Sequence, residues 1–254
     1  MSYIDLHSAL RDWPYDPEKI SVRKIQGVDG AVRMQLRVEL GIIQMQIDGR
    51  PDGTLPCGFG SLLEFHQQRL ARHTERNGTP LGYAVQPREC EALRLEASLY
   101  YRRYVGFFVL EEFDGVVRDT DHSLKIFDLC REYAMDQDDA AALEEFRPYV
   151  LMMHARGQAF QAIAEGQPAS ALAHVNRGIL AIKSHLEQSG PPELLENCDE
   201  IDVLRTLSAE LDGQMPDGSI LVTRKALREA IEQEHFEEAA RLRDELRNLY
   251  PPTP

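Results

Sequence analysis

The residue types that could bind a metal ion or act in catalysis gather in a few short groups. His66 and His73 are seven positions apart on a predicted helix. They share one face but lie two turns apart, too far to bind one ion without further ligands. Asp119, Asp121 and His122 are close in sequence, but nearby positions of a helix face different ways. We expect this second group to form a solvated helix face rather than a metal site.

An acidic segment at 136–139 could be taken for a calcium-binding loop. Such a loop needs glycine at its sixth position, where Ala141 stands, and glutamate at its twelfth, where Arg147 stands. Asp138 and Asp139 fit the start of a helix better, because capping groups and negative charge are favourable there. We therefore expect neither a metal nor another cofactor.

Motifs of the common enzyme classes are absent from the sequence. There is no Gly-x-Ser-x-Gly, no His-Glu-x-x-His, no dinucleotide fingerprint and no phosphate-binding loop. The four cysteines include no Cys-x-x-Cys pair, so we expect reduced thiols rather than disulfides or a zinc site. We expect a protein without catalytic activity, and an unrecognised active site stays open as an alternative.

The charge of the chain is unevenly distributed. Its 254 residues include 28 Lys and Arg against 42 Asp and Glu, a net charge of −14. Residues 1–86 hold ten basic and ten acidic side chains, so the whole excess of negative charge lies in 87–254. An acidic surface repels phosphate backbones, and we expect no direct binding of nucleic acid. It favours either a basic peptide or protein as partner, or solubility alone.

The sequence contains no candidate membrane segment. No window approaches the ~18 uncharged apolar residues of a membrane span. Asp5 and Asp12 stand near the start, where a secretion signal would need a basic end and an apolar run. We expect a cytoplasmic protein that does not bind membranes.

The elements that must position these residues begin with a small α/β module over 1–86. Apolar and polar residues alternate over 31–40 and 42–48, and a weaker strand over 20–26 precedes them, which predicts a three-stranded meander. A short helix is predicted over 4–12. A helix at about 60–77 is expected to cover the apolar face of the sheet. Another possibility, which no motif supports, is a small ligand bound beside Arg33, Arg37 and Arg50.

Helical periodicity dominates from residue 87 to about 190. It predicts helices over 89–109, from 113 through 129, over 138–164 and over 168–187. Small and aromatic residues in two segments resemble tetratricopeptide repeats: Tyr104, Phe108, Val116 and Leu124, and then Gly157, Phe160, Ala171 and Gly178. In that family, small residues let two antiparallel helices approach, while aromatic ones fill the gap between successive pairs. The two segments are 55 positions apart rather than ~34, so the resemblance implies a TPR-like bundle over 87–212 rather than a regular superhelix.

The most specific pattern lies at the C-terminal end, where residues 221–249 read as a helical hairpin. Leu227, Ala230 and Ile231 form one apolar face, and the turn falls near residues 234 and 235. Apolar residues of the second helix follow a 3-3-4-3 spacing, which is typical of paired helices. They are Phe236, Ala239, Leu242, Leu246 and Leu249.

The stretch AIEQEHFEEAARLRDEL at 230–246 resembles the UVR motif of UvrB, UvrC, some stress-response adaptors and Clp ATPases. Phe236 matches the aromatic of the motif, Ala239 and Ala240 its small pair, and 242–244 its Leu-Arg-Asp core. The helicase and nuclease portions of those repair proteins are absent, as are the cysteine pairs of the protein-arginine-kinase activator type. The resemblance implies protein association, often of hairpin against hairpin.

We predict that the hairpin over 219–250 carries the partner-binding residues. They are Leu227, Ile231, Phe236, Ala239, Ala240, Leu242, Arg243 and Leu246. Some thirty residues in two helices bury too little apolar surface to be stable alone, so this face should dock onto another surface. The alternative is that it docks onto its own chain. Basic and acidic residues nearly balance in the hairpin, so we expect no contact with DNA.

Together these patterns predict an α+β fold that is mostly α. It comprises the β-meander module (1–86), the TPR-like bundle (87–212) and the UVR-type hairpin (219–250). The predicted function is non-catalytic protein–protein interaction, as an adaptor or scaffold. The alternative is an accessory factor of nucleotide excision repair that contacts repair proteins through the hairpin.

Overall fold

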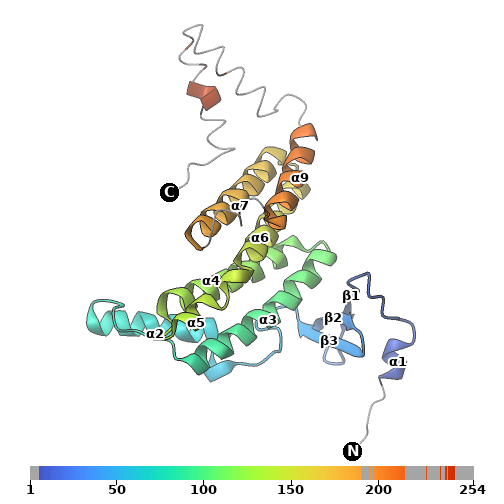
Figure 1. Cartoon of the computed structure of the whole chain (residues 1–254). Coiled ribbons are helices and arrows are strands. Elements are labelled where there is room, and N and C mark those ends of the chain that lie inside the picture. Colours follow the sequence, from blue (N-terminus) through green and yellow to red (C-terminus); the bar gives the residue numbers. More distant parts are fainter. Residues whose placement is uncertain are drawn as a thin grey trace, which may run out of the picture. The chain divides into compact units, whose positions relative to one another are not determined.

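The computed structural model describes residues 6–189, 195, 197–214, 227, 235, 238 and 240–243 (Figure 1). These residues form helices and one small antiparallel sheet, which confirms the predicted α+β, mostly α fold class. The chain divides into two compact units, Met1–Glu145 and Phe146–Pro254.

The sheet of the N-terminal unit is the predicted meander. Its strands are β1 (Val22–Gln26), β2 (Val32–Val38) and β3 (Gly41–Gln46), antiparallel and in the order β1-β2-β3. In the register, Met34 lies between Lys24 and Met45, and Leu36 lies between Val22 and Ile43. Because side chains alternate along a strand, these residues share one largely apolar face.

The helices of this unit begin and end where the local sequence favours it. They are α1 (His7–Leu10), η1 (Pro56–Gly58), α2 (Leu62–Asn77), α3 (Pro87–Val109), α4 (Phe113–Tyr133), α5 (Gln137–Ala141) and η2 (Glu144–Phe146). The Ser61 side chain caps α2 by accepting from the Glu64 N–H. Gly78, with φ of +72°, ends α2 in a left-handed conformation that glycine adopts readily.

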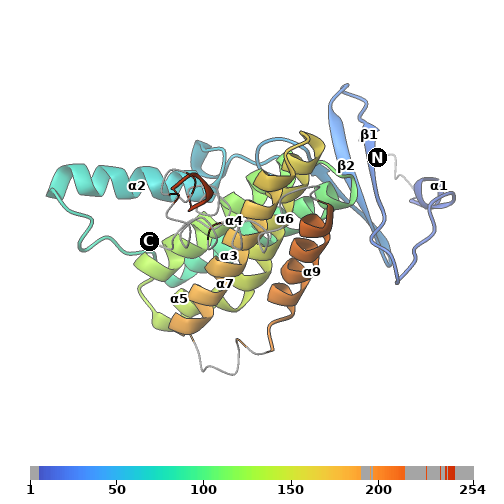
Figure 2. The ribbon, with the colours of Figure 1, turned by 90° about the horizontal axis from the view of Figure 1, so that it is seen from above.

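The apolar face of the sheet packs on α3 and α4, so the expectation that α2 covers it was wrong. Met34 and Met45 form one core cluster with Phe107 and Val116. A methyl group on Gly106 would lie 2.3 Å from the Met34 sulfur, so this glycine lets the sheet approach α3 closely. Figure 2 shows α2 at the opposite end of the α3–α4 pair from the sheet. The sheet thus shares its core with α3 and α4, and the two units divide after Glu145, while the predicted three-part division of the chain stays a prediction.

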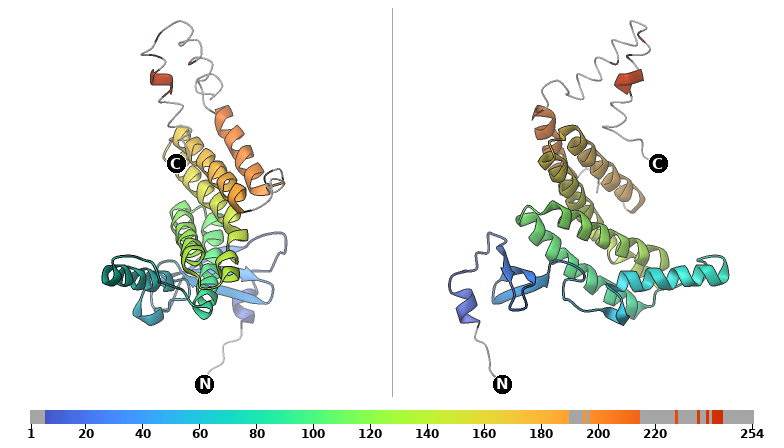
Figure 3. Two further views of the ribbon diagram at one scale, coloured as in Figure 1. Left: turned by 60° about the vertical axis from the view of Figure 1, so that its left-hand side comes forward. Right: turned by 180° about the vertical axis from the view of Figure 1, so that it is seen from behind.

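The C-terminal unit is built on three helices, α6 (Arg147–Ala164), α7 (Pro168–Ser189) and α9 (Asp199–Gln214). The helices α6 and α7 pack closely against each other, and α9 packs against both of them, as Figure 3 shows. A methyl group on Gly178 of α7 would lie 2.4 Å from the Ala155 Cβ of α6, so small residues bring these helices together. This close approach is the one expected of a tetratricopeptide-like pair, an interpretation that stays a prediction.

Two expectations for the helical region differ from the structure. The single helix predicted over 138–164 is divided into α5, η2 and α6. Pro148 explains the division, because proline fits the first turn of a helix but not its interior. The helix α9 was not predicted at all, although acidic residues mark its first turn.

Candidate functional site

Four of the eight predicted partner-binding residues fall within the described parts of the hairpin. Leu227 is helical and half-buried. Ala240, Leu242 and Arg243 lie in a helical stretch in which Leu242 is 7% exposed, while its two neighbours in sequence are exposed. The remaining four predicted residues lie outside the described residues: Ile231, Phe236, Ala239 and Leu246.

Residues 238 and 240–243 are helical, and Leu242 is buried between exposed neighbours. Arg241 donates to the Glu238 carboxylate at 2.9 Å, and both side chains are mostly exposed. Leu242 is covered within the single chain, which is the kind of contact that docking onto the same chain predicts for it. Contact between the seam and a partner stays a prediction.

The histidines considered for metal binding have ordinary structural partners. His66 is buried, and its Nδ1 lies 3.2 Å from the Tyr83 hydroxyl. His73 Nε2 lies 3.0 Å from the Leu81 carbonyl oxygen. Across the part of the chain that the structure describes, no group of three or more His, Cys, Asp and Glu could hold a metal ion.

A second candidate site, which the sequence did not reveal, lies within the N-terminal unit. Arg103 of α3 and Asp119 of α4 are 1% and 0% exposed and form two hydrogen bonds, of 2.6 and 2.8 Å. Arg103 Nη1 also donates to the carbonyl oxygens of Gln46 and Gly49, at 3.0 and 2.7 Å. This one guanidinium therefore joins both helices to the end of β3 and the loop after it.

Glu96 of α3 is a second buried charge, and it holds the start of α2. Its carboxylate accepts from the backbone N–H groups of Leu62 and Leu63, at 2.8 and 3.2 Å, and lies 3.1 Å from His122 Nε2. Arg50 Nε lies 3.3 Å from the same carboxylate. Burial acts to raise the pKa of Glu96, but the bonds from His122 and the two N–H groups outweigh it and lower that pKa. Glu96 is therefore ionised near neutral pH, and His122 Nε2 carries the proton that it donates.

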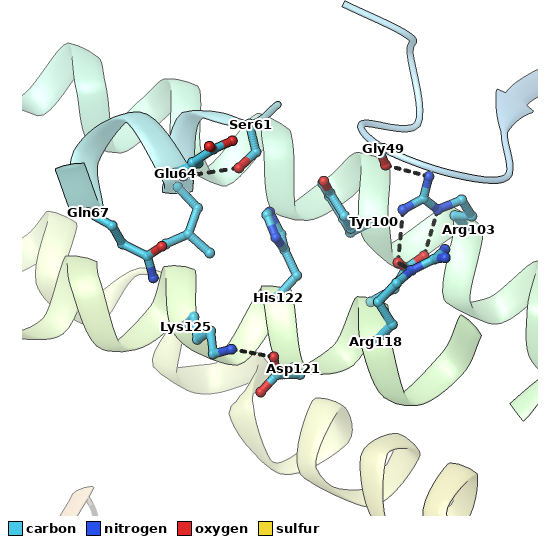
Figure 4. Close-up of a pocket in the computed structure, with 12 residues that line it drawn as sticks. Gly49, Ser61, Glu64, Gln67, Tyr100, Arg103, Arg118, Asp121, His122 and Lys125 are labelled. Carbon is cyan, nitrogen blue, oxygen red and sulfur yellow. Dashed lines mark hydrogen bonds and ion pairs between the residues drawn. The ribbon is translucent and has the colours of Figure 1, made fainter. Parts of the chain in front are cut away.

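A cavity of about 340 Å³ lies beside these charged groups, as Figure 4 shows. Side chains from α2, α3 and α4 line it, together with Gly49. The rings of Tyr100 and His122 stack with centroids 3.7 Å apart and planes 14° apart. Burial raises the pKa of Tyr100 to about 12, so its hydroxyl stays neutral at physiological pH.

The structure corrects the expectation of a solvated face at Asp119 and His122. Both side chains are enclosed, and only Asp121 of that group is largely exposed. Asp119 lies three positions after Val116 and seven before Ile126, on the buried stripe of α4. A carboxylate on such a stripe needs a buried partner, and Arg103 supplies it.

Glu96 and Arg103 are not among the site residues predicted from the sequence, although a signal for both is present. They lie on the buried stripe of α3 with Leu93, Tyr100 and Tyr104. Charged residues at such positions indicate buried ion pairs. The arginines proposed to flank a ligand do not line this cavity. Arg33 pairs with Asp29, Arg37 donates to the Trp13 carbonyl oxygen, and Arg50 forms an ion pair with Glu96.

Comparison with known proteins gives a match at the C-terminal end of the chain. Residues 219–250 match the family model described as the UvrB/uvrC motif, which confirms the resemblance inferred from the sequence. This match covers 32 of the 254 residues. No curated protein and no solved structure matches the chain. None of the helices within the described residues is long and apolar enough to cross a membrane.

Proposed function

We propose that this chain is a protein-interaction factor that binds another protein, or a second copy of itself, through the hairpin at 219–250. The observation that carries the proposal is the match of these residues to the UvrB/uvrC motif. That motif occurs in excision-repair proteins and mediates association. An adaptor or scaffold role is the finer form of the proposal.

The physical character of the hairpin supports an interaction role. Two short helices cannot bury enough apolar surface to be stable alone, so their seam gains most of its stability by docking. Six basic against seven acidic side chains over 221–249 favour a protein partner over nucleic acid.

A role in nucleotide excision repair is the second candidate, and the same match favours it because the motif is named after two repair proteins. In this form of the proposal the chain is an accessory factor that contacts repair proteins through the hairpin. The excess of negative charge after residue 86 further favours a basic surface on any partner of the helical region.

The test is a quantitative pull-down with the full chain and two neighbouring variants, Leu242→Asp and Arg241→Asp. Both variants introduce the same carboxylate, but Leu242 is buried and the Arg241 side chain is 70% exposed. We expect Leu242→Asp to lower the capture of specific partners at least about tenfold, since loss of a buried apolar anchor costs ~2 kcal/mol or more. Arg241→Asp should retain them.

The identity of the captured proteins separates the two forms of the proposal. Repair subunits would favour the excision-repair role, and ATPases, kinases or other regulatory proteins would favour an adaptor. Light scattering on both variants tests self-association in the same way. Equal capture and equal mass for the two variants would contradict a role of the hairpin seam. Circular dichroism of both variants checks that the helices outside the hairpin remain folded.

A further inference from the structure

The cavity of the N-terminal unit has the size of a small-molecule site. Its volume of about 340 Å³ lies within the range of ~300–1,000 Å³ that is common for such sites. Leu63 and the stacked rings of Tyr100 and His122 supply apolar surface, and the other lining residues are polar. The hairpin and its proposed role do not involve this cavity.

Every charged side chain that lines the cavity already has a partner. Arg103 and Arg118 both bond to Asp119, whose buried carboxylate they share. Lys125 lies 2.6 Å from Asp121. These ion pairs are drawn as dashed lines in Figure 4 for Arg103 and Lys125.

The last charged group, Glu64, accepts from the Gly60 N–H at 2.9 Å. The lining therefore holds three cations and three carboxylates, which balance. A charged ligand would have to break one of the ion pairs in order to enter. The Arg103–Asp119 pair is almost fully buried and is costly to separate, so the cavity disfavours both anions and cations beside it, whereas the Lys125–Asp121 pair is about half exposed.

Neutral groups, in contrast, keep unused hydrogen-bonding capacity. His122 Nε2 donates to Glu96, so in the neutral imidazole Nδ1 is an acceptor, and no described residue bonds to it. Ser61 accepts from the Glu64 N–H and still has its own O–H to donate. The Tyr100 hydroxyl and the Gln67 amide have no hydrogen-bond partner among the residues that the structure describes.

Two of these groups, His122 and Tyr100, are held in place before any ligand arrives. Glu96 bonds at once to the first N–H groups of α2 and to His122, so it fixes the position of the imidazole relative to α2. The ring of Tyr100 is fixed by its stacking on His122. Binding groups that are already ordered lose little entropy when a ligand arrives.

We propose that this cavity binds a small uncharged molecule that carries a hydrogen-bond donor next to an acceptor, as hydroxyl-rich and amide compounds do. Its donor group bonds to His122 Nδ1. Its acceptor receives hydrogen bonds from the Tyr100 and Ser61 hydroxyls or from the Gln67 amide. The balanced charge of the lining selects against charged molecules of the same size.

The test uses the full chain and ligand-observed NMR titrations with defined probes. Uracil and nicotinamide represent amides, ribose and glycerol represent hydroxyl compounds, and inorganic phosphate and methylammonium are the charged controls. We expect at least one uncharged probe to bind with a Kd in the millimolar range, as its few heavy atoms allow, and neither charged probe to bind. Whether the amide probes or the hydroxyl probes bind shows which of these two classes of compound the cavity accepts.

A matched pair of variants places the binding at the cavity. Tyr100→Phe removes only a hydroxyl that has no hydrogen-bond partner among the described residues, so the melting temperature should not fall. It should weaken the bound probe about 2- to 10-fold, the effect of one hydrogen bond. Tyr101→Phe, at a neighbouring position that does not line the cavity, should bind like the parent chain.

Three outcomes would overturn the proposal. The first is that no uncharged probe binds, and the second is that phosphate or methylammonium binds more tightly than the uncharged probes. The third is that Tyr100→Phe and Tyr101→Phe bind the probe equally well. None of these outcomes bears on the hairpin, whose variants are tested by protein capture.

Discussion

The cores of the two units contain different types of residue. In the N-terminal unit, buried charges of α3 and α4 lie among apolar residues: Glu96 and Asp119 are fully buried, and Arg103 nearly so. Among the described residues of the C-terminal unit, the core of α6, α7 and α9 is mainly small and aliphatic. It includes Ala155, Ala159, Ala171, Leu172, Val175, Ile182 and Leu204.

This difference separates two ways of fixing a structure. Buried charges must each meet a specific partner, because an unpaired charge in a core is very costly. They therefore determine one arrangement of α2, α3, α4 and the end of β3, and this arrangement surrounds the cavity. Small residues fix only the distance between packed helices and require no specific partner, and such packing is sufficient for a scaffold. The prediction with the largest effect concerns the first kind of core.

Arg103→Leu should destabilise the N-terminal unit by about 3–5 kcal/mol. The variant leaves the Asp119 carboxylate in the core with Arg118 alone, and it removes the bonds to Gln46 and Gly49. Urea unfolding followed by fluorescence measures the effect. The single tryptophan, Trp13, lies in this unit and reports on it.

Arg131→Leu is the matched control, because Arg131 and its nearer partner Asp128 have about half-exposed side chains and its second partner, Glu144, lies 3.8 Å away. It should cost less than about 1 kcal/mol. A double variant, Arg103→Leu with Asp119→Leu, should cost less than the two single changes added together, since it leaves no unpaired charge. Equal effects of Arg103→Leu and Arg131→Leu would show that the buried pair is not what holds the unit together.

The sequence predicted elements well where their signals are local. Alternation predicted the three strands, and helical periodicity predicted α2, α3, α4 and α7. The sequence did not reveal that the sheet packs on α3 and α4. Alternation shows that a face needs a cover, but nothing local links Met34 to Phe107, some seventy positions away.

The two candidate sites differ in predictability for the same reason. The hairpin was recognised because its motif lies within one continuous stretch, and the comparison confirmed it. The cavity was missed because its residues come from three helices and a loop, and each charge was interpreted singly. Asp119 looks like a surface residue until Arg103, sixteen positions earlier on another helix, is seen beside it.

A smaller effect is expected in the C-terminal unit, where volume matters more than charge. Gly178→Ala places a methyl group 2.4 Å from the Ala155 Cβ, so α6 and α7 must separate. We expect a cost of about 1–3 kcal/mol from this overpacking. Urea unfolding followed by far-ultraviolet circular dichroism measures it.

Gly213→Ala provides the comparison, because a methyl group there would meet no atom within 4 Å. Both variants replace a helical glycine by alanine, which by itself stabilises a helix by up to about 1 kcal/mol. Gly213→Ala should therefore be neutral or stabilising. If Gly178→Ala were equally well tolerated, the close contact between α6 and α7 would not limit the packing of this unit.

The smallest expected effect concerns the pH dependence of the N-terminal unit. The folded pKa of Glu96 is lowered below its unfolded value, since the bonds from His122 and the α2 N–H groups outweigh burial. Its contribution to stability is therefore complete above the unfolded pKa, near 4.5, and is lost as the pH falls through the folded pKa. Because burial opposes the hydrogen bonds, the net effect should be modest.

Glu96→Gln should remove this acid sensitivity, because the amide does not titrate. Between about pH 5 and pH 3, the stability of the variant should fall less steeply than that of the parent chain, as measured by Trp13 fluorescence in urea. Glu91→Gln, at an exposed position of the same helix, should keep the slope of the parent. Parallel profiles for Glu96→Gln and the parent would mean that the Glu96 carboxylate does not stabilise α2, and that the polar side of the cavity is not fixed in the way proposed here.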